Sequence, residues 1–412
     1  MNRLRAISLF TGAGGLDLGF EAAGFETAIA VEMDARCVET LSANRSWSVI
    51  QRDVGRVTTR ELLEAGGLKG EQADILIGGP PCQPFSKSGF WATGEARRLD
   101  DPRATTIDHY LRILEEARPR AFLLENVEGL GFKGKDEGLG RIRSALEAIN
   151  ARYGTRYQAS VAVLNAADHG VPQLRRRLFV VGARDGSRFH FPEPSHVAPE
   201  DVLPGDNRPR WRTAWDALHD LPEPHDPALK LKGKWAGLLP SIPEGENYLH
   251  HTDRGRGEPL FGWRRRYWSF LLKLAKDQPA WTLQAQPGPA TGPFHWASRR
   301  LSVREMARLQ TFPDDFEIKG SVADAQRQLG NAVPSLLAEV LARSIRAQLL
   351  GAPHSAEEPL LVCRAAESTP APERLRPVPA LYLTLRGSHA AHPGTGLGYR
   401  ASSREPRAVA AE

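Results

Sequence analysis

The chain has 412 residues, 41% hydrophobic and 25% charged, which is enough to bury the cores of two or three domains. Its formal net charge of +5 permits a nucleic-acid partner but does not require one. We expect neither a leader nor a membrane span, because no apolar run is long enough to cross a bilayer. Cys37, Cys82 and Cys363 are too few and too scattered for a disulfide framework, so we expect free thiols and a cytoplasmic protein.

The N-terminal segment predicts a strand, a glycine turn and a helix in succession. Residues 4–10 are apolar, residues 11–15 contain three glycines, and a helical pattern begins near Asp17. This order lets backbone N–H groups approach a nucleotide-like ligand, although a plain tight turn is the alternative interpretation. Glu32 and Asp53 follow the next two predicted strand ends and can accept hydrogen bonds from a ribose and an adenine amino group. Each acid alone is better explained as a helix or turn cap, but the glycine turn and the two acids together favour a nucleoside pocket at one sheet edge.

A cysteine follows the fourth predicted strand. The strand at residues 75–78 ends in Gly79, Pro80 and Pro81, and Cys82 comes next. Pro81 and Pro84 fix φ on both sides of the thiol, so this loop should be stiff. The loop alone is compatible with a buried structural cysteine or with a nucleophile.

Strands and helices continue to alternate as far as residue 185. Helical spacing covers residues 103–118 and 138–153, and apolar strand-like runs cover residues 121–124, 160–164 and 177–182. This alternation predicts an α/β fold with a doubly wound, mostly parallel sheet and helices on both faces.

The alternation ends between residues 186 and 298. This segment carries seven of the nine tryptophans, and its 23 residues from 254 to 276 hold seven basic residues and one acidic residue. It predicts a smaller, irregular lobe whose aromatics either form its own core or line a nucleic-acid groove. Order returns with a capping box at Ser302 and Glu305, and a last helix follows Pro334. The composition of residues 353–412 predicts a mostly disordered tail, in which residues 381–385 could form one strand.

Six motifs, in this order, resemble those of the DNA (cytosine-5)-methyltransferases, and most closely the single-chain bacterial modification enzymes. The match covers roughly residues 5–350. Its motifs are Phe10-Thr11-Gly12-Ala13-Gly14-Gly15, Pro80-Pro81-Cys82-Gln83-Pro84-Phe85-Ser86, Glu125-Asn126-Val127, Gln173-Leu174-Arg175-Arg176-Arg177, residues 304–316 and Gly330-Asn331-Ala332-Val333-Pro334. The resemblance implies the S-adenosylmethionine-dependent methyltransferase fold. It divides the chain into a catalytic domain (1–185), a target-recognition lobe (186–298), a return segment that completes the catalytic domain (299–352) and the tail (353–412).

The resemblance also implies a mechanism. Cys82 would add to carbon 6 of a flipped cytosine, so that carbon 5 can take a methyl group from S-adenosyl-L-methionine. Glu125 would need a raised pKa to bind the base edge in its protonated form, and Arg175 and Arg177 would fix the pyrimidine and its phosphates. Strand alternation would point both arginines to one side and Arg176 to the other.

Two further sets of residues follow from the resemblance. The implied cofactor site consists of Phe10, Gly12, Gly14, Leu16, Glu32, Met33, Asp53, Val54, Pro80, Asn331 and Val333. The implied nucleic-acid contacts are Gln83, Ser86, Gln173, Arg264, Arg265, Arg266 and Thr282. No metal is implied. The expected partners are double-stranded DNA and a restriction endonuclease that acts on the same site, with the enzyme itself a monomer.

Other functions are compatible with part of the pattern. An RNA cytosine-5 methyltransferase would share most of the motifs, and the long aromatic lobe favours duplex DNA. An inactive DNA-binding relative is disfavoured because Cys82, Glu125 and the arginine pair are all present. A nicotinamide-dependent dehydrogenase is disfavoured because the glycine spacing departs from G-x-G-x-x-G.

Overall fold

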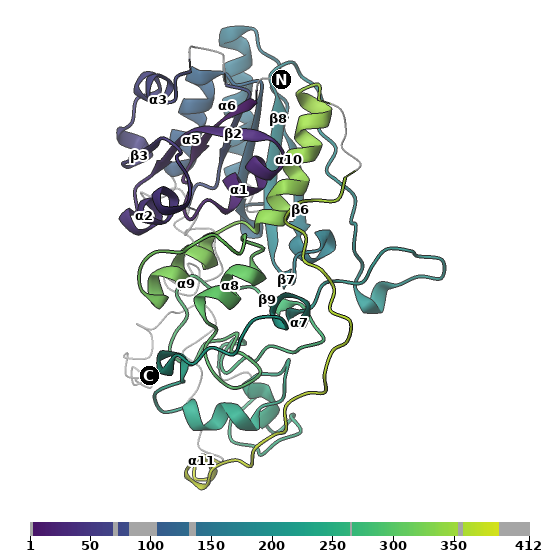
Figure 1. Ribbon diagram of the computed structural model, residues 1–412. Helices are drawn as coiled ribbons and strands as arrows, with labels where there is room; N and C mark the ends of the chain where they lie inside the picture. The colour runs from purple at the N-terminus through teal and green to yellow at the C-terminus, as the bar shows by residue number, and fades with distance from the viewer. Residues whose placement is uncertain are drawn as a thin grey trace, which may run out of the picture.

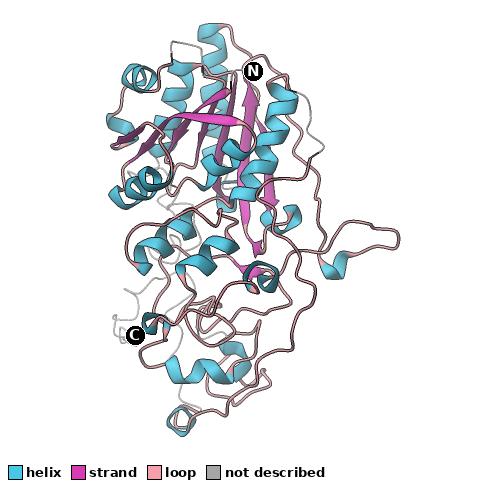
Figure 2. Cartoon of the chain, viewed as in Figure 1, coloured by secondary structure: helices cyan, strands magenta, loops and turns pink. Residues whose placement is uncertain are grey.

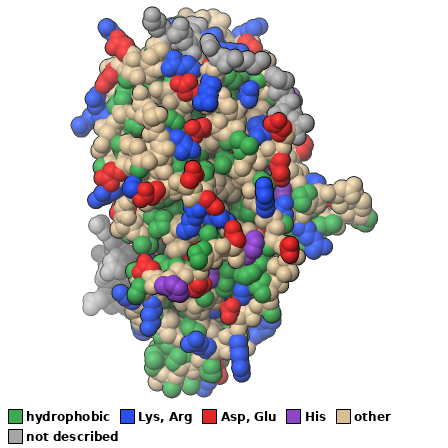
Figure 3. Space-filling model, in the orientation of Figure 1, with side chains coloured by type: hydrophobic (Ala, Val, Ile, Leu, Met, Phe, Trp, Pro, Cys, Tyr) green, Lys and Arg blue, Asp and Glu red, His purple; other side chains and the backbone are tan. Residues whose placement is uncertain are grey.

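The computed structural model describes residues 3–68, 73–81, 105–131, 137–263, 266–352 and 357–386. Its upper lobe is built around a β-sheet, and its lower lobe consists mainly of loops with short helices (Figures 1 and 2). Basic and acidic side chains are interspersed over the visible face of both lobes (Figure 3), in line with the small net charge.

Seven strands form the sheet of the upper lobe, in the order β3-β2-β1-β4-β5-β8-β6. Their bounds are β1 (Leu4–Leu9), β2 (Phe25–Glu32), β3 (Val49–Gln51), β4 (Ile75–Gly78), β5 (Ala121–Val127), β6 (Ser160–Asn165) and β8 (Arg176–Ala183). Within this sheet β8 alone runs in the opposite direction to the other strands, so the predicted mostly parallel sheet is confirmed. The central strands are nearly continuous apolar runs because helices cover both of their faces.

Helices α3 (Thr59–Ala65), α5 (Thr105–Ala117) and α6 (Glu137–Tyr153) pack on one face of the sheet. Helices α1 (Gly15–Ala22) and α10 (Ser335–Leu349) pack on the other face, and α2 (Ala35–Asn44) follows β2. The last long helix of the chain, α10, therefore packs on the sheet that the first half of the chain forms. In the part of the chain that the structure describes, no helix is long and apolar enough to span a membrane.

The two lobes meet at a second, smaller sheet and a group of short helices. Strand β7 (Gln173–Leu174) of the upper lobe pairs in parallel with β9 (Ala280–Trp281) of the lower lobe. Helices α7 (Ala214–Leu218), α8 (Val303–Leu309) and α9 (Val322–Asn331) share one apolar core at this junction. The described 3₁₀ helices are η1 (Val54–Arg56), η5 (Glu128–Gly131), η6 (Ala166–His169), η7 (Pro199–Asp201), η8 (Pro227–Leu229), η9 (Ala236–Ser241) and η10 (Tyr248–His251).

The expectation of a mostly disordered tail is wrong for residues 357–386. This segment runs from beside α10 down the side of the lower lobe to α11 (Ala380–Leu383) (Figure 1). Residues 381–383 are therefore helical and do not form the expected strand. Tyr382 of α11 is 3% exposed and belongs to the apolar core of the lower lobe, which explains why the segment is ordered.

Candidate active site

Glu125 lies at the end of β5, beside the loop that follows β4. Its side chain is 11% exposed. A Cβ atom built on Gly79 would lie 2.9 Å from Glu125 Oε2, so the glycine leaves the space that the carboxyl group occupies. Any larger residue at position 79 would displace Glu125 or the loop.

Two hydrogen bonds hold the loop of residues 79–81 in place. Asn126 Nδ2 donates to the carbonyl oxygen of Pro80 at 3.2 Å, and Thr106 Oγ1 donates to that of Pro81 at 3.1 Å. Proline has no N–H group, so these carbonyl contacts and the fixed φ angles define the path of the chain. Pro81 directly precedes Cys82, which lies outside the described residues together with Gln83 and Ser86.

The arginine pair is arranged as strand alternation predicts. Arg177 Nε lies 3.0 Å from Glu125 Oε1, and its side chain is 16% exposed. Arg176 points the other way, is 59% exposed and pairs with Glu128 at 3.0 Å. Arg175 is fully buried on the side of Arg177, because successive residues of a strand face opposite sides.

Burial and charge act in opposite directions on Glu125. Burial raises the pKa of its carboxyl group, whereas the charges of Arg177 and Arg175 lower that pKa. Burial also lowers the pKa of each guanidinium. The net effect is a raised pKa for Glu125, in the direction that a protonated carboxyl group requires.

Arg175 links three segments of the chain. Its Nη2 donates to the carbonyl oxygen of Gly330 in α9 at 2.8 Å, and its Nη1 donates to that of Leu283, which follows β9, at 3.4 Å. A Cβ atom on Gly330 would lie 2.4 Å from the backbone of Ala285, so only glycine allows this close approach. Arg175 therefore joins the segment between β7 and β8 to α9 and to the lower lobe.

The turn between β1 and α1 forms a second edge of the site. Gly12 has a φ of 57°, and its N–H donates to Glu32 Oε2 at 2.7 Å. The N–H of Asp34 donates to Glu32 Oε1 at 2.8 Å. A Cβ atom built on Gly12 meets nothing within 4 Å, so the turn opens onto free space beside an acidic group. This combination fits a ligand with ribose hydroxyl groups.

Other residues of the predicted cofactor site differ in what they offer a ligand. Met33 is 68% exposed next to Glu32. Asp53 caps η1 through the N–H of Gly55 at 2.8 Å, as the turn-cap alternative predicts, and its side chain remains exposed. Leu16 and Val54 are 7% and 3% exposed and pack into the core, so their backbone atoms rather than their side chains can face a ligand.

The remaining predicted positions of this set surround the same turn. Phe10 and Gly14 take left-handed backbone conformations, with φ of 55° and 82°. A Cβ atom on Gly15 would lie 2.3 Å from the carbonyl oxygen of Val333, which places the return segment against the glycine turn. Asn331 is exposed at the end of α9.

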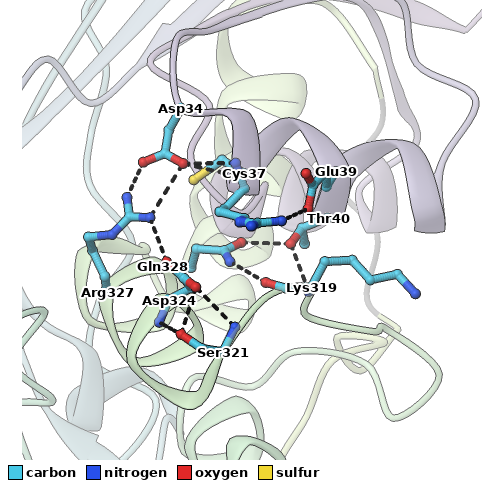
Figure 4. Close-up of polar contacts among 10 residues, drawn as sticks. Asp34, Cys37, Glu39, Thr40, Lys319, Ser321, Asp324, Arg327 and Gln328 are labelled. Atoms are coloured by element: carbon cyan, nitrogen blue, oxygen red, sulfur yellow. Dashed lines mark hydrogen bonds and ion pairs between the residues drawn. The ribbon is translucent and has the colours of Figure 1, made fainter.

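A polar seam between α2 and α9 has no counterpart among the sequence-based predictions (Figure 4). Arg327 donates hydrogen bonds to Asp34, and Thr40 Oγ1 donates to Gln328 Oε1 at 2.7 Å. Because the N–H of Asp34 also binds Glu32, the seam fixes the end of β2 against the helix that carries Asn331. The sequence signal for α9 is the capping box of Ser321 and Asp324, a serine followed three residues later by an acid.

Comparisons with known proteins agree with this geometry. Residues 4–347 match the model of the family described as C-5 cytosine-specific DNA methylase. The chain belongs to this family. It is thus a DNA cytosine-5 methyltransferase, and its family uses S-adenosylmethionine.

Individual relatives cover most of the methylase. It is 42% identical to the type II methyltransferase M.SacI of Streptomyces achromogenes, over 84% of this chain and 94% of the relative. It is 33% identical to M1.HphI of Haemophilus parahaemolyticus, over 83% and 86% of the two chains. A structure of Entamoeba histolytica methyltransferase EhMeth superposes with a TM-score of 0.58 at 15% identity, over 85% of this chain and 99% of the other. A structure of a Spodoptera frugiperda DNMT2 mutant superposes with a TM-score of 0.57 at 16% identity, over 83% of this chain and 99% of the other. The last two confirm the fold.

The residues predicted to contact nucleic acid are only partly placed at a free surface of the methylase. Gln173 is fully buried, accepts a hydrogen bond from the N–H of Leu283 at 3.2 Å and donates to the carbonyl oxygen of Leu309 at 3.1 Å. Its predicted DNA contact is therefore wrong, because its polar atoms join the two lobes internally. Thr282 Oγ1 donates to the carbonyl oxygen of Leu174 at 2.6 Å. Arg266 is exposed, whereas Arg264 and Arg265 lie outside the described residues.

Proposed function

We propose that this methyltransferase modifies carbon 5 of a cytosine within a specific duplex DNA sequence, as the modification enzyme of a type II restriction–modification system. The names of its relatives support the biological context, since M.SacI is 42% identical over most of both chains. The partner would be an endonuclease that cleaves the same sequence unless it is methylated. The monomeric state and the cytoplasmic location expected from the sequence remain predictions.

The observation that carries the mechanism is the loop at residues 79–81. Asn126 and Thr106 hold this loop, and Gly79 lies against Glu125, which pairs with Arg177. Cys82 follows directly, so its thiol comes next to the groups that would receive a base. The other cysteines are poor nucleophiles. Burial raises the pKa of Cys363 to about 12 and that of Cys37 further, so neither forms a thiolate near neutral pH.

The residues then have distinct roles. The Cys82 thiolate adds to carbon 6 of the flipped cytosine, and the ring electrons move toward carbon 5. Protonated Glu125 donates a hydrogen bond to ring nitrogen 3, while the nearby Arg177 offsets negative charge in the buried site. Bound S-adenosylmethionine supplies the methyl group. Loss of the carbon-5 proton and expulsion of the Cys82 thiolate restore the aromatic ring and the free enzyme.

The glycine turn and its acidic neighbours would hold the cofactor. Phe10, Gly12 and Gly14 would line its methionine portion, Glu32 would accept hydrogen bonds from its ribose, and Asp53 would accept one from the adenine amino group. The free space beside Gly12 and the exposed side chain of Asp53 support this assignment. The other contacts would come from Leu16, Met33, Val54, Pro80, Asn331 and Val333.

Replacement of Cys82 tests the proposed nucleophile. Cys82→Ala should abolish methyl transfer and leave S-adenosylmethionine binding in place, whereas the control variant Cys363→Ala should keep normal turnover. Duplex DNA that contains 5-fluorocytosine should trap a covalent complex, and peptide mapping should locate the adduct on Cys82. Turnover by Cys82→Ala, or an adduct at another residue, would contradict the assignment.

The nature of the substrate requires a separate experiment. Genomic DNA is incubated with the purified enzyme and S-adenosylmethionine and then sequenced after bisulfite treatment. We expect 5-methylcytosine at one position of one recurring sequence. Transfer to an RNA duplex of the same sequence at an equal or higher rate would instead favour the RNA methyltransferase alternative.

A further inference from the structure

Arg327 joins the two helices of the polar seam. It lies on α9, and its guanidinium group donates hydrogen bonds to both carboxylate oxygens of Asp34, the N-cap residue of α2 (Figure 4). The side chains of Arg327 and Asp34 are 27% and 28% exposed, so water screens this pair less than it screens a fully exposed ion pair. Asp324, one turn earlier on α9, holds the same guanidinium group at 3.3 Å. Arg327 therefore has a defined position and fixes the start of α2.

Asp34 transmits this restraint to Glu32. The backbone N–H of Asp34 donates to Glu32 Oε1 at 2.8 Å, while the N–H of Gly12 donates to Oε2 at 2.7 Å. Burial raises the pKa of Glu32, and these two N–H groups oppose that shift because they stabilise the ionised carboxylate. A displacement of Asp34 would therefore remove one of the two hydrogen bonds that orient Glu32.

The face of α9 that carries Arg327 also carries Asn331. The two residues are four positions apart, which places them side by side on a helix. Two residues further on, the carbonyl oxygen of Val333 would lie 2.3 Å from a Cβ atom built on Gly15, so this part of the chain lies against the glycine turn. The pairing of Arg327 with Asp34 thus ties the end of β2 to the segment that approaches the glycine turn from the opposite direction.

We propose that Arg327 is a positioning residue for cofactor binding. Through Asp34 it orients Glu32, and through α9 it holds Asn331 opposite that carboxylate. The inference rests on the proposed function, in which Glu32 accepts hydrogen bonds from the ribose of S-adenosylmethionine. An acceptor that is already oriented binds a hydroxyl group with less loss of conformational entropy than a mobile one. Since Arg327 does not act on the reacting atoms, its loss should weaken cofactor binding and leave the methyl-transfer step intact.

Calorimetric titration of the full-length protein with S-adenosylmethionine tests this role. Arg327→Ala should raise the Kd by roughly 2- to 12-fold, the range for the net loss of one hydrogen bond. Arg327→Lys keeps the charge and one donor group, so its Kd should fall between those of Arg327→Ala and wild type. At saturating cofactor both variants should reach the wild-type kcat on DNA, so that the defect appears in the KM for S-adenosylmethionine alone.

A double-mutant cycle with Glu32→Ala tests the path through which Arg327 acts. In the Glu32→Ala background, Arg327→Ala should cause no further loss of affinity, because the group that it orients is gone. Additive losses of affinity, or wild-type affinity in Arg327→Ala, would overturn the proposal. Unchanged binding by Glu32→Ala would instead contradict the ribose contact assigned under the proposed function.

Two control variants separate positioning from general loosening of the seam. Thr40→Val removes the hydrogen bond to Gln328 at 2.7 Å, so it should lower the Tm but keep the wild-type cofactor affinity. Arg36→Ala removes an exposed ion pair with Glu39 on α2 and should change neither quantity. A loss of affinity in Thr40→Val equal to that in Arg327→Ala would overturn the proposal.

Further variants keep the proposal testable if Arg327→Ala fails to fold. Asp34→Asn retains a side-chain oxygen that can cap α2 but removes the charge that pairs with Arg327. It should weaken cofactor binding in the same direction as Arg327→Lys. Wild-type affinity in both of these variants would overturn the proposal.

Discussion

Asp17 is a buried acid beside the glycine turn between β1 and α1. It is fully buried in the first turn of α1 and accepts hydrogen bonds from Ser8 Oγ at 3.0 Å and Thr27 Oγ1 at 3.2 Å. Burial raises its pKa to about 7, and the two hydroxyl groups oppose this shift. In the unfolded chain an aspartate is exposed to water and titrates near its ordinary value of about 3.9. Between these two pKa values, the folded protein therefore holds a proton on Asp17 that the unfolded chain has lost.

This difference predicts how stability depends on pH. The folded state binds more protons at Asp17 between about pH 4 and about 7, so the contribution of this group to the free energy of unfolding falls as pH rises through that window. The loss is on the order of a few kcal/mol. Asp17→Asn removes the titration, so urea unfolding from pH 5 to 8 should show the variant gaining stability relative to wild type as pH rises.

Glu64→Gln, on the exposed surface of α3, serves as the control for the Asp17 measurement. A difference between Asp17→Asn and wild type that stays constant over the pH range would show that Asp17 does not titrate there.

Single residues of the site are predictable from the sequence where a local rule fixes their direction. Strand alternation places Arg175 and Arg177 on one side and Arg176 on the other. The prediction for Gln173 is wrong because its partners are the backbone groups of Leu283 and Leu309, more than 100 positions away in the sequence. A polar side chain gives no local signal of whether it faces solvent or a distant carbonyl group.

At the scale of elements, the close contact of α1 with α10 explains why the end of the chain completes the first domain. Gly19 of α1 faces α10, and a Cβ atom there would lie 2.4 Å from Ala338 Cβ and 2.5 Å from the carbonyl oxygen of Ser335. The two backbones therefore approach more closely than any other residue at position 19 would permit. Val333, just before α10, lies against the glycine turn, so the contact of α1 with α10 also positions one side of that turn.

Substitution of Gly19 should therefore destabilise the protein. Alanine favours a helix interior over glycine by about 1 kcal/mol, but the clash at Gly19→Ala should cost about 1–3 kcal/mol and outweigh this gain. Gly140→Ala in α6 is the matched control, because its Cβ atom meets nothing within 4 Å, and this variant should be slightly more stable than wild type. Urea unfolding compares the two variants, and equal effects would show that α10 can shift to accommodate the added methyl group without a loss of stability.

Elements with strong periodicity are predictable from the sequence, and those without it are not. Strands β1, β2 and β4 and helices α5 and α6 agree with apolar runs or helical spacing in the sequence. Helix α9 escapes prediction because Asp324 takes the capping-box position usually held by Glu or Gln and because the helix ends in Gly330 and Asn331, which break helical patterns. Strands β7 and β9 have two residues each, too few for any alternation to be visible.

At the scale of the whole molecule, residues 357–386 connect the two lobes. Glu339 of α10, which is fully buried, accepts hydrogen bonds from the N–H groups of Leu360 and Leu361 at 2.7 and 2.9 Å. Further along, Glu373 pairs with Lys276 of the lower lobe at 3.0 Å. The composition of the segment predicts disorder because it averages over many residues, whereas a few buried anchors fix its course.

Two truncated chains test this connection. A chain that ends at Ala352 lacks the whole segment, and one that ends at Arg386 keeps it. The shorter chain uncovers the ring of Trp235, whose centroid lies 6.1 Å from that of Tyr382. Its lower lobe should therefore be less stable, and it should methylate DNA more slowly.

Tyr382→Ala should reproduce much of this loss of stability, about 3–5 kcal/mol for a buried aromatic side chain. Tyr382→Phe should lose only about 1 kcal/mol with its hydrogen bond to the carbonyl oxygen of Lys234. Thermal unfolding and limited proteolysis measure these effects, and equal stability of the two truncated chains would show that the connection is dispensable.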